Sequence, residues 1–427
     1  MKGFLATVGT ILLFLAAVRM DAAGTVHPLL AAGLLIVLSF FASESFAKAK
    51  LPKWMGCVAI GMLIGPEGLG LIPPEVFGKI EWLAMLALGW VAFRLGLGSS
   101  GAQGRWRKSA SAAVLLVGVS FAGTFLALLL GGVPIVFALL LGTIATASAP
   151  LVLSSMQDHG ERPEHSSEQS LVIATSVLVL LMWIGVVGGI QLAHSRWIPA
   201  SVWLPGLKLV GATALAVLVS WILRLIRYTG LLGPVFLSAC MVALHLLLAS
   251  EAALFLFAVT LGIVLPKGGE CREGQRATGR REAQMAALFL AVFLGTRIQF
   301  RFVGTASFPW VIAGIYVAAM VASKLAGIHL ARPLLKRMGL RRWDGAAGFL
   351  PQLFLPLALI AATQRQLSGA LGFERLSEFS NVAYWGVIWG SLIFPVVARV
   401  KGKGSAPDWN GEACETPPAQ CAPSMEE

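Results

Sequence analysis

Residues 50–72 read KLPKWMGCVAIGMLIGPEGLGLI, an apolar run that begins after Pro52 and ends in the turn GPEGLG at 65–70. Gly56 and Gly61 place small residues along the face of this segment. Proline at the entry and glycine with proline at the exit are typical helix boundaries. The stretch therefore predicts a membrane helix with a glycine-spaced face, closed by a glycine–proline turn.

The whole chain has the same apolar character. Apolar residues make up 57% of the 427 positions, charged residues only 13%, and the mean hydropathy is +0.80. A soluble protein of this length needs more polar residues for its surface. The apolar residues fall in runs of about 17–25, which is the length that crosses a bilayer as a helix. Since lipid offers no hydrogen bonds to the backbone, the sequence predicts an all-α polytopic membrane protein.

The runs predict about fourteen transmembrane helices. They are expected at 3–18, 28–47, 54–72, 80–98, 110–131, 134–156, 168–193, 202–226, 231–249, 251–266, 282–302, 307–331, 344–364 and 381–399.

Lys and Arg gather in every second loop, for example at 48–53, 105–108, 267–281 and 332–342. The positive-inside rule places such loops in the cytoplasm. Both termini are therefore expected on the cytoplasmic side of a bacterial-type inner (plasma) membrane. The net charge of +12 has the same origin, so it does not indicate a nucleic-acid partner.

The two ends of the chain are expected to lie outside the main transmembrane domain. Residues 1–27 predict an extra helix and loop, because Arg19 and Asp21 make a poor signal-peptide cleavage site. Residues 402–427 are rich in Pro, Ser and Glu, and a disordered cytoplasmic tail is expected there. The main transmembrane domain is expected to cover 28–401.

Motifs for cofactor binding or hydrolysis are missing from the sequence. The five cysteines have no CxxC pair or metal spacing, and neither a P-loop nor a dinucleotide fingerprint occurs. A membrane enzyme would need clustered Asp, Glu or His at one membrane face, which only the loop at 158–168 approaches. We therefore expect no cofactor, no metal and no enzymatic activity.

Further motifs follow the GPEGLG turn in a fixed order. They are GTIATASAP at 142–150, GTRIQ at 295–299, KLAG at 324–327 and GAAGFLPQLFLPLAL at 345–359. Their order and spacing strongly resemble the monovalent cation:proton antiporter family, in its Kef-like and sodium–proton exchanger branch. The resemblance covers about 28–400 and implies a homodimer in the lipid bilayer, with a small cation and a proton as substrates.

The resemblance implies an antiporter fold of two inverted repeats, at about 54–193 and 251–400. The predicted spans at 134–156 and 344–364 would then be the two discontinuous crossing helices. Pro150 in the first span, and Pro351 and Pro356 in the second, each remove a helix hydrogen bond. Paired interrupted helices are the best sequence signal for a transport site at mid-membrane.

The acidic residues typical of that site are missing. Residues 169–250 contain no Asp or Glu, and Thr175 and Ser176 stand where the resemblance implies the ion-binding carboxylates. Gln352 follows Pro351 where the family has an Arg-Gly-Glu stretch. The resemblance and the residue types together give the ion-binding candidates as Thr146, Ser148, Thr175, Ser176, Lys324 and Gln352.

Two interpretations follow. In the first, cation transport continues through hydroxyl and carbonyl oxygens, and the proton-coupling acid is Glu44 or Glu251. Each acid also has a structural explanation: Glu44 would pair with Lys48 one turn on, and Glu251 would cap a helix N-terminus.

In the second interpretation, the protein keeps the antiporter scaffold without antiport. The intramembrane charges that remain are then basic, namely Arg94, Arg297 and Lys324. Such a site suits an anion or a polar solute, or the chain acts as a membrane sensor or partner subunit. Arg94 and Arg297 are alternatively expected to extend from helix ends toward water, while Lys324 needs a carbonyl, a water or a distant acid as its partner.

Overall fold

The structure is a computed structural model, and all of its regular structure is helical in the residues that it describes. These are 28–48, 53–66, 68–99, 106–147, 164–194, 200–225, 240–241, 250–264, 285–297, 308–338, 354–371 and 376–389. The predicted N-terminal segment at 1–27 and the predicted tail at 402–427 lie outside them.

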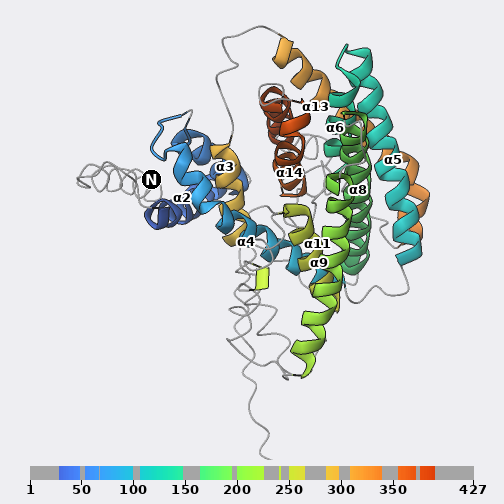
Figure 1. The fold of residues 1–427 in the computed structure, drawn as a ribbon, viewed down its shortest axis with the longest axis horizontal. Helices are drawn as coiled ribbons and strands as arrows, with labels where there is room; N and C mark the ends of the chain where they lie inside the picture. Colours follow the sequence, from blue (N-terminus) through green and yellow to red (C-terminus); the bar gives the residue numbers. More distant parts are fainter. Residues whose placement is uncertain are drawn as a thin grey trace, which may run out of the picture.

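Ten helices carry labels in Figure 1. They are α2 (Pro28–Lys48), α3 (Lys53–Ile64), α4 (Pro74–Ser99), α5 (Trp106–Leu130), α6 (Ile135–Thr146), α8 (Glu164–His194), α9 (Ala200–Leu225), α11 (Glu251–Val264), α13 (Phe308–Arg337) and α14 (Phe354–Leu371). Two further helices are Met285–Thr296 and 376–389.

These twelve helices correspond one by one to twelve of the fourteen predicted spans. The other two, at 3–18 and 231–249, lie outside the described residues apart from 240–241, so the total of fourteen stays a prediction. Six helices within the described ranges are long and apolar enough to cross a membrane. Helices α3 and α6 have 12 residues each, or about 18 Å of rise, and a bilayer core of about 30 Å is thicker than that.

The helices form two groups. In Figure 1, α2 and α3 of the first group lie on one side of α14, and α5, α6 and α8 of the second group lie on the other. The panel group is α2, α3, α4, α9, α11 and Met285–Thr296, and the core group is α5, α6, α8, α13, α14 and 376–389. The most extensive pairings lie within the groups: α4 packs along α11 in the panel group, and α5 packs along α13 in the core group.

Glycine allows the closest helix contacts in the panel group. A Cβ added to Gly61 of α3 would overlap the Val292 carbonyl oxygen and lie 3.0 Å from Gly295 Cα. A Cβ added to Gly96 of α4 would likewise lie 3.0 Å from Gly262 Cα of α11. Each contact joins the first helix of one predicted repeat to the second helix of the other. Two repeats related by a two-fold axis would give this reciprocal pairing, and the repeat boundaries stay a prediction.

The turn that ends α3 follows the sequence pattern. The Leu69 N–H donates to the Leu63 carbonyl at 2.7 Å, and the Gly70 N–H donates to the Gly65 carbonyl at 3.0 Å. Gly70 has a φ of 61°, a left-handed conformation that glycine adopts without steric cost. Glycine is therefore required at this helix end for a physical reason.

Two predicted boundaries near the C-terminal end of the described residues are wrong. Helix α14 continues to Leu371, past the predicted end at 364, and the last helix already includes 376, before the predicted start at 381. The polar stretch QRQ at 364–366 has low hydropathy and resembles a loop by that measure. Gln and Arg are nevertheless good helix formers, and inside a protein their polar groups find partners.

Replacing Gly61 by Ala is expected to destabilise the protein by about 2 kcal/mol, because the added methyl group meets backbone atoms that have no room to move. The matched control is Gly118→Ala in α5, where nothing lies within 4 Å of the added carbon. That change is expected to be neutral or stabilising by up to about 1 kcal/mol. Thermal unfolding in detergent measures both, and equal unfolding temperatures would contradict the proposed packing.

Candidate functional site

Helix α6 ends inside the protein. Its last residue is Thr146, and Ala147 follows with an extended conformation, φ −62° and ψ 133°. Ala147 is fully buried, and its N–H donates back to the Ile144 carbonyl at 3.1 Å. The final carbonyl groups of a helix have no partner in the helix itself, and together they carry about half a negative charge. The end of α6 is therefore a buried site that attracts a cation.

The side chain of Lys324 supplies that cation. It extends from α13, is 3% exposed, and its Nζ donates a hydrogen bond to the Ala147 carbonyl oxygen at 3.0 Å. A carbonyl partner was one of the alternatives open for Lys324, and the structure confirms it. An ammonium group at a helix C-terminus is favourable both as a hydrogen-bond donor and as a charge.

Packing between α13 and α5 fixes the position of Lys324. The neighbouring residue Ser323 shares a hydrogen bond of 3.0 Å with Thr124 of α5. Gly123 lies opposite Ser323, and a Cβ added to Gly123 would come within 2.6 Å of the Ser323 Cβ. The absence of a side chain at Gly123 thus lets α13 approach α5 closely enough for Lys324 to reach α6.

The predicted hydroxyl candidates within the described ranges are buried. Thr146 donates to the Thr143 carbonyl at 2.6 Å, and Thr175 donates to the Val172 carbonyl at 2.8 Å, so both use their proton within their own helix. Ser176 is 3% exposed. A hydroxyl that donates to the backbone keeps acceptor lone pairs on its oxygen, and such oxygens suit a cation. Ser148 and Gln352 lie outside the described residues.

Thr175 and Ser176 lie next to a buried cluster of the core group that Lys324 also adjoins. A buried apolar cluster joins α5, α8 and α13, and its members include Ala174 and Ile328. Thr175 and Ser176 follow Ala174 directly, and Lys324 precedes Ile328 by one helical turn. The hydroxyls and the lysine therefore border the same cluster on α8 and α13.

Four helices of the core group carry no carboxylate over their described lengths, whereas α8 carries Glu164 and Glu168 near its start. The four helices are α5, α6, α13 and α14. The ammonium is thus held by a backbone carbonyl and by the helix dipole in helices without an acidic residue. A buried charge of this kind is costly in a membrane, which marks Lys324 as a functional candidate.

The predicted coupling acids lie elsewhere. Glu44 pairs with Lys53 of α3 at 3.3 Å, so the expected pairing with Lys48 is wrong; both side chains are 40% exposed. Lys53 is the first residue of α3, and α3 packs against α2. This packing brings the Lys53 ammonium to Glu44, a contact that the spacing of residues along α2 alone does not predict.

Helix α11 begins at Glu251, but the side chain that caps it belongs to Ser250. The Ser250 Oγ accepts the Ala253 N–H at 3.4 Å. The expectation of a cap by Glu251 is therefore corrected: serine has the shorter side chain and a strong preference for the position before a helix.

The two predicted intramembrane arginines lie in the panel group. Arg94 is half-buried in α4. Arg297 does not simply extend toward water, as one alternative expected, because its guanidinium donates to Glu81 Oε1 at 3.2 Å and lies 5.2 Å from the centre of the Phe293 ring. The expectation was wrong because α4 brings the Glu81 carboxylate within reach of Arg297, at the end of Met285–Thr296.

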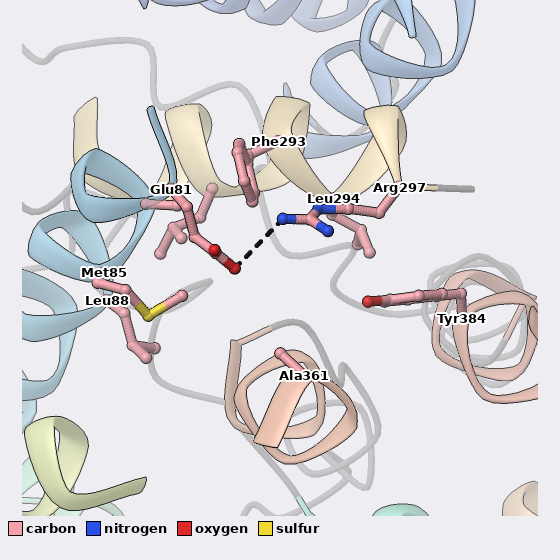
Figure 2. A pocket seen from close by; sticks show the side chains of 10 residues that line it. Glu81, Met85, Leu88, Phe293, Leu294, Arg297, Ala361 and Tyr384 are labelled. Atoms are coloured by element: carbon pink, nitrogen blue, oxygen red, sulfur yellow. Dashed lines mark hydrogen bonds and ion pairs between the residues drawn. The ribbon is translucent and has the colours of Figure 1, made fainter. Parts of the chain in front are cut away.

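A second polar cluster surrounds Glu81, which the sequence did not single out. Its carboxylate also meets Arg365 of α14 at 2.8 Å. A cavity of about 50 Å³ adjoins Glu81 and Arg297, and Figure 2 shows the Tyr384 hydroxyl directed into the same space. The only signal for this cluster in the sequence was Glu81 itself, an acid inside a predicted span. Its partners Arg297 and Arg365 lie far away along the chain, so the sequence did not indicate the pairing.

Comparison with solved structures identifies the fold. The chain is similar to the sodium proton antiporter MjNhaP1 from Methanocaldococcus jannaschii at pH 8, with a TM-score of 0.62 and 17% identity over 90% of this chain and 97% of that one. A second structure of that antiporter, from a 3D EM map, gives a TM-score of 0.67 and 16% identity over 87% and 95%. No family model matches the sequence. No curated protein matches it either. The antiporter fold predicted from the sequence motifs is thereby confirmed.

Replacing Lys324 by Met is expected to leave the unfolding temperature unchanged or to raise it. The change loses the bond to Ala147 but removes a desolvated charge, and apolar replacements of buried charges are typically neutral or stabilising by about 1–4 kcal/mol. Thermal unfolding in detergent is the measurement, with Lys208→Met in α9 as the control. A loss as large as that of Gly61→Ala would contradict this, and would indicate that Lys324 serves stability.

Proposed function

We propose that this chain is a secondary transporter that works by alternating access and exchanges a monovalent cation for a proton. The fold shared with a sodium proton antiporter supports transport in general. One observation carries the specific proposal, namely the bond from Lys324 to the carbonyl at the end of α6, formed in helices that have no carboxylate of their own.

Lys324 is the proton-carrying group in this proposal. A sodium or potassium ion would coordinate the Ala147 carbonyl oxygen, which the ammonium now occupies. When Lys324 releases its proton, the neutral amine no longer competes for that oxygen, and the cation takes its place. One proton leaves for each cation bound, so the site carries one positive charge in both states.

Hydroxyl oxygens complete the cation site. Thr146 adjoins Ala147, and Thr175 and Ser176 contribute from α8, with Ser148 as a further candidate. Thr175 and Ser176 thus replace the carboxylates implied by the family resemblance. Coupling through Glu44 is less well supported, because Glu44 forms a half-exposed ion pair with Lys53 of α3, and Glu251 stays an alternative.

A second candidate is transport of an anion or a small polar solute. The specific observation in its favour is the absence of Asp and Glu from α5, α6, α13 and α14. An anion would then bind the Lys324 ammonium directly, and the loaded site would be neutral. A protein without flux, acting as a sensor or partner subunit, is the third outcome of the test below.

The proposed setting is an inner membrane with both termini in the cytoplasm, and the proposed assembly is a homodimer. Apolar side chains of α9 are exposed, including Leu207 at 69% and Val210 at 68%. Such a face suits lipid or a second copy of the chain. No enzymatic step is part of this proposal.

The test is cation-dependent proton flux in proteoliposomes that contain a pH-sensitive dye. Sodium, potassium and lithium are added in turn to the wild type and to Lys324→Met. We expect the wild type to exchange at least one of these ions, and the variant to lose flux by roughly tenfold or more, as removal of a proton-transfer group typically does. Lys208→Met is the matched control and should retain its flux.

Three results would change the conclusion. Full flux in Lys324→Met would show that another group carries the proton. A wild type without cation-driven flux, but with uptake of chloride, nitrate or acetate that requires Lys324, would favour the anion transporter. A wild type with no flux at all, in which Thr175→Asp with Ser176→Asp creates cation flux, would favour the sensor or partner subunit.

A further inference from the structure

Glu81 forms ion pairs with two arginines from two different helices. Its Oε1 atom lies 3.2 Å from Arg297 Nη2 and 2.8 Å from Arg365 Nη2. Glu81 and Arg297 both belong to the panel group, on α4 and at the end of Met285–Thr296. Arg365 belongs to the core group, on α14. The carboxylate thus has one partner within its own group and one partner across the boundary between the groups.

Two side-chain hydrogen bonds join α14 to α8 of the core group on either side of Arg365, and α14 also packs against α11 of the panel group. Trp183 Nε1 of α8 donates to Thr363 Oγ1 at 2.9 Å, and Gln191 Nε2 of α8 donates to the Gln366 carbonyl at 3.2 Å. Both bonds join α14 to its neighbour in the core group. If the core group moves relative to the panel group, Arg365 therefore moves with it, while Glu81 stays beside Arg297.

The cavity lies between the two groups and is lined by Glu81 and Arg297. Met85 and Leu88 of α4 and Phe293 line it from the panel group, and Ala361 and Tyr384 line it from the core group (Figure 2). Its volume of about 50 Å³ has room for roughly four water molecules. Helices α4 and α14 share few close backbone contacts, so side chains make the connection between them here.

The ion pair is suited to open and close. The side chains of Glu81 and Arg365 are 24% and 37% exposed, and partly exposed ion pairs are weak because water screens them. When Arg365 leaves, Glu81 remains paired with Arg297, so no charge is left buried alone in the panel group. The contacts between glycines that hold α3 and α4 to their neighbours involve backbone atoms and permit no comparable opening.

We propose that the cavity is an entrance to the substrate pathway and that the Glu81–Arg365 ion pair is its gate. The inference rests on the alternating-access transport proposed above. Glu81 lies about two turns from the start of α4, whose other end leads into the basic loop at 105–108. The positive-inside prediction therefore puts the gate on the side of the membrane away from the cytoplasm. The open gate admits a small hydrated ion to a carboxylate and two guanidinium groups.

The test measures how fast a membrane-impermeant maleimide labels Ala361→Cys in the full-length protein in membrane vesicles. The wild-type chain, with its native cysteines, gives the background rate. Adding Glu81→Gln or Arg365→Gln to Ala361→Cys is expected to raise the labelling rate by roughly threefold. Loss of one partly exposed ion pair would increase the population of the open gate by about that factor. The double variant should label no faster than either single variant, because both remove the same contact.

Two controls test whether the ion pair itself is responsible. Glu75→Gln changes an exposed acid on the same helix and should leave the labelling rate unchanged. Arg365→Lys keeps the charge and should label almost as slowly as the parent. Unchanged labelling in both Glu81→Gln and Arg365→Gln, with normal unfolding temperatures, would overturn the gate.

Failure of the gate can be told apart from failure of the proposed function. Unchanged labelling, together with cation flux that requires Lys324, would leave the transporter intact and remove only the gate. Increased labelling in a protein with no flux under any gradient would retain the gate between the two groups and remove the transport proposal.

Discussion

A helix that ends inside a membrane leaves carbonyl groups that lipid cannot satisfy, and α6 ends in this way at Thr146. The rest of the core group depends on how this end is satisfied. Lys324 reaches it at 3.0 Å only because Gly123 allows α13 to lie against α5. The Thr124–Ser323 hydrogen bond fixes the same helix pair one residue away. A helix break, a small residue and a buried charge therefore form one structural unit.

The panel group is held together by close contacts between glycines. Its helices meet at Gly61–Gly295 and Gly96–Gly262, where backbones touch and the contact tolerates almost no displacement. Between the two groups, by contrast, Glu81 pairs with Arg365 and also lines a cavity. Rigid contacts thus lie within the panel group, and an adjustable contact lies between the groups. This distribution is the one that movement of one rigid unit against another requires.

The sequence predicted the features that depend on hydropathy and on the chemistry of neighbouring residues. The apolar runs located twelve helices, glycine and proline marked the end of α3, and the lack of acids required Lys324 to find another partner. The sequence did not predict partners that three-dimensional packing supplies. Arg365 lies in a polar stretch that hydropathy excluded from its helix, and Glu81 gave no sign of meeting it. Ser250 capped α11 where the more conspicuous Glu251 was expected, because a cap depends on side-chain length more than on charge.

The lack of Asp and Glu in the described lengths of α5, α6 and α13 bears on the energetics of transport. If a cation replaces the proton of Lys324, the site carries the same charge in both states. The work that the membrane potential does on the core in one direction is then cancelled on the return, so the exchange is electroneutral over a full cycle. If an anion binds the ammonium, the loaded site becomes neutral and the two states differ by one charge. A potential of 100 mV then contributes about 2.3 kcal/mol for each charge that crosses the whole membrane. The single buried ammonium held at the end of α6 therefore links the choice of substrate to the electrical behaviour of the transporter.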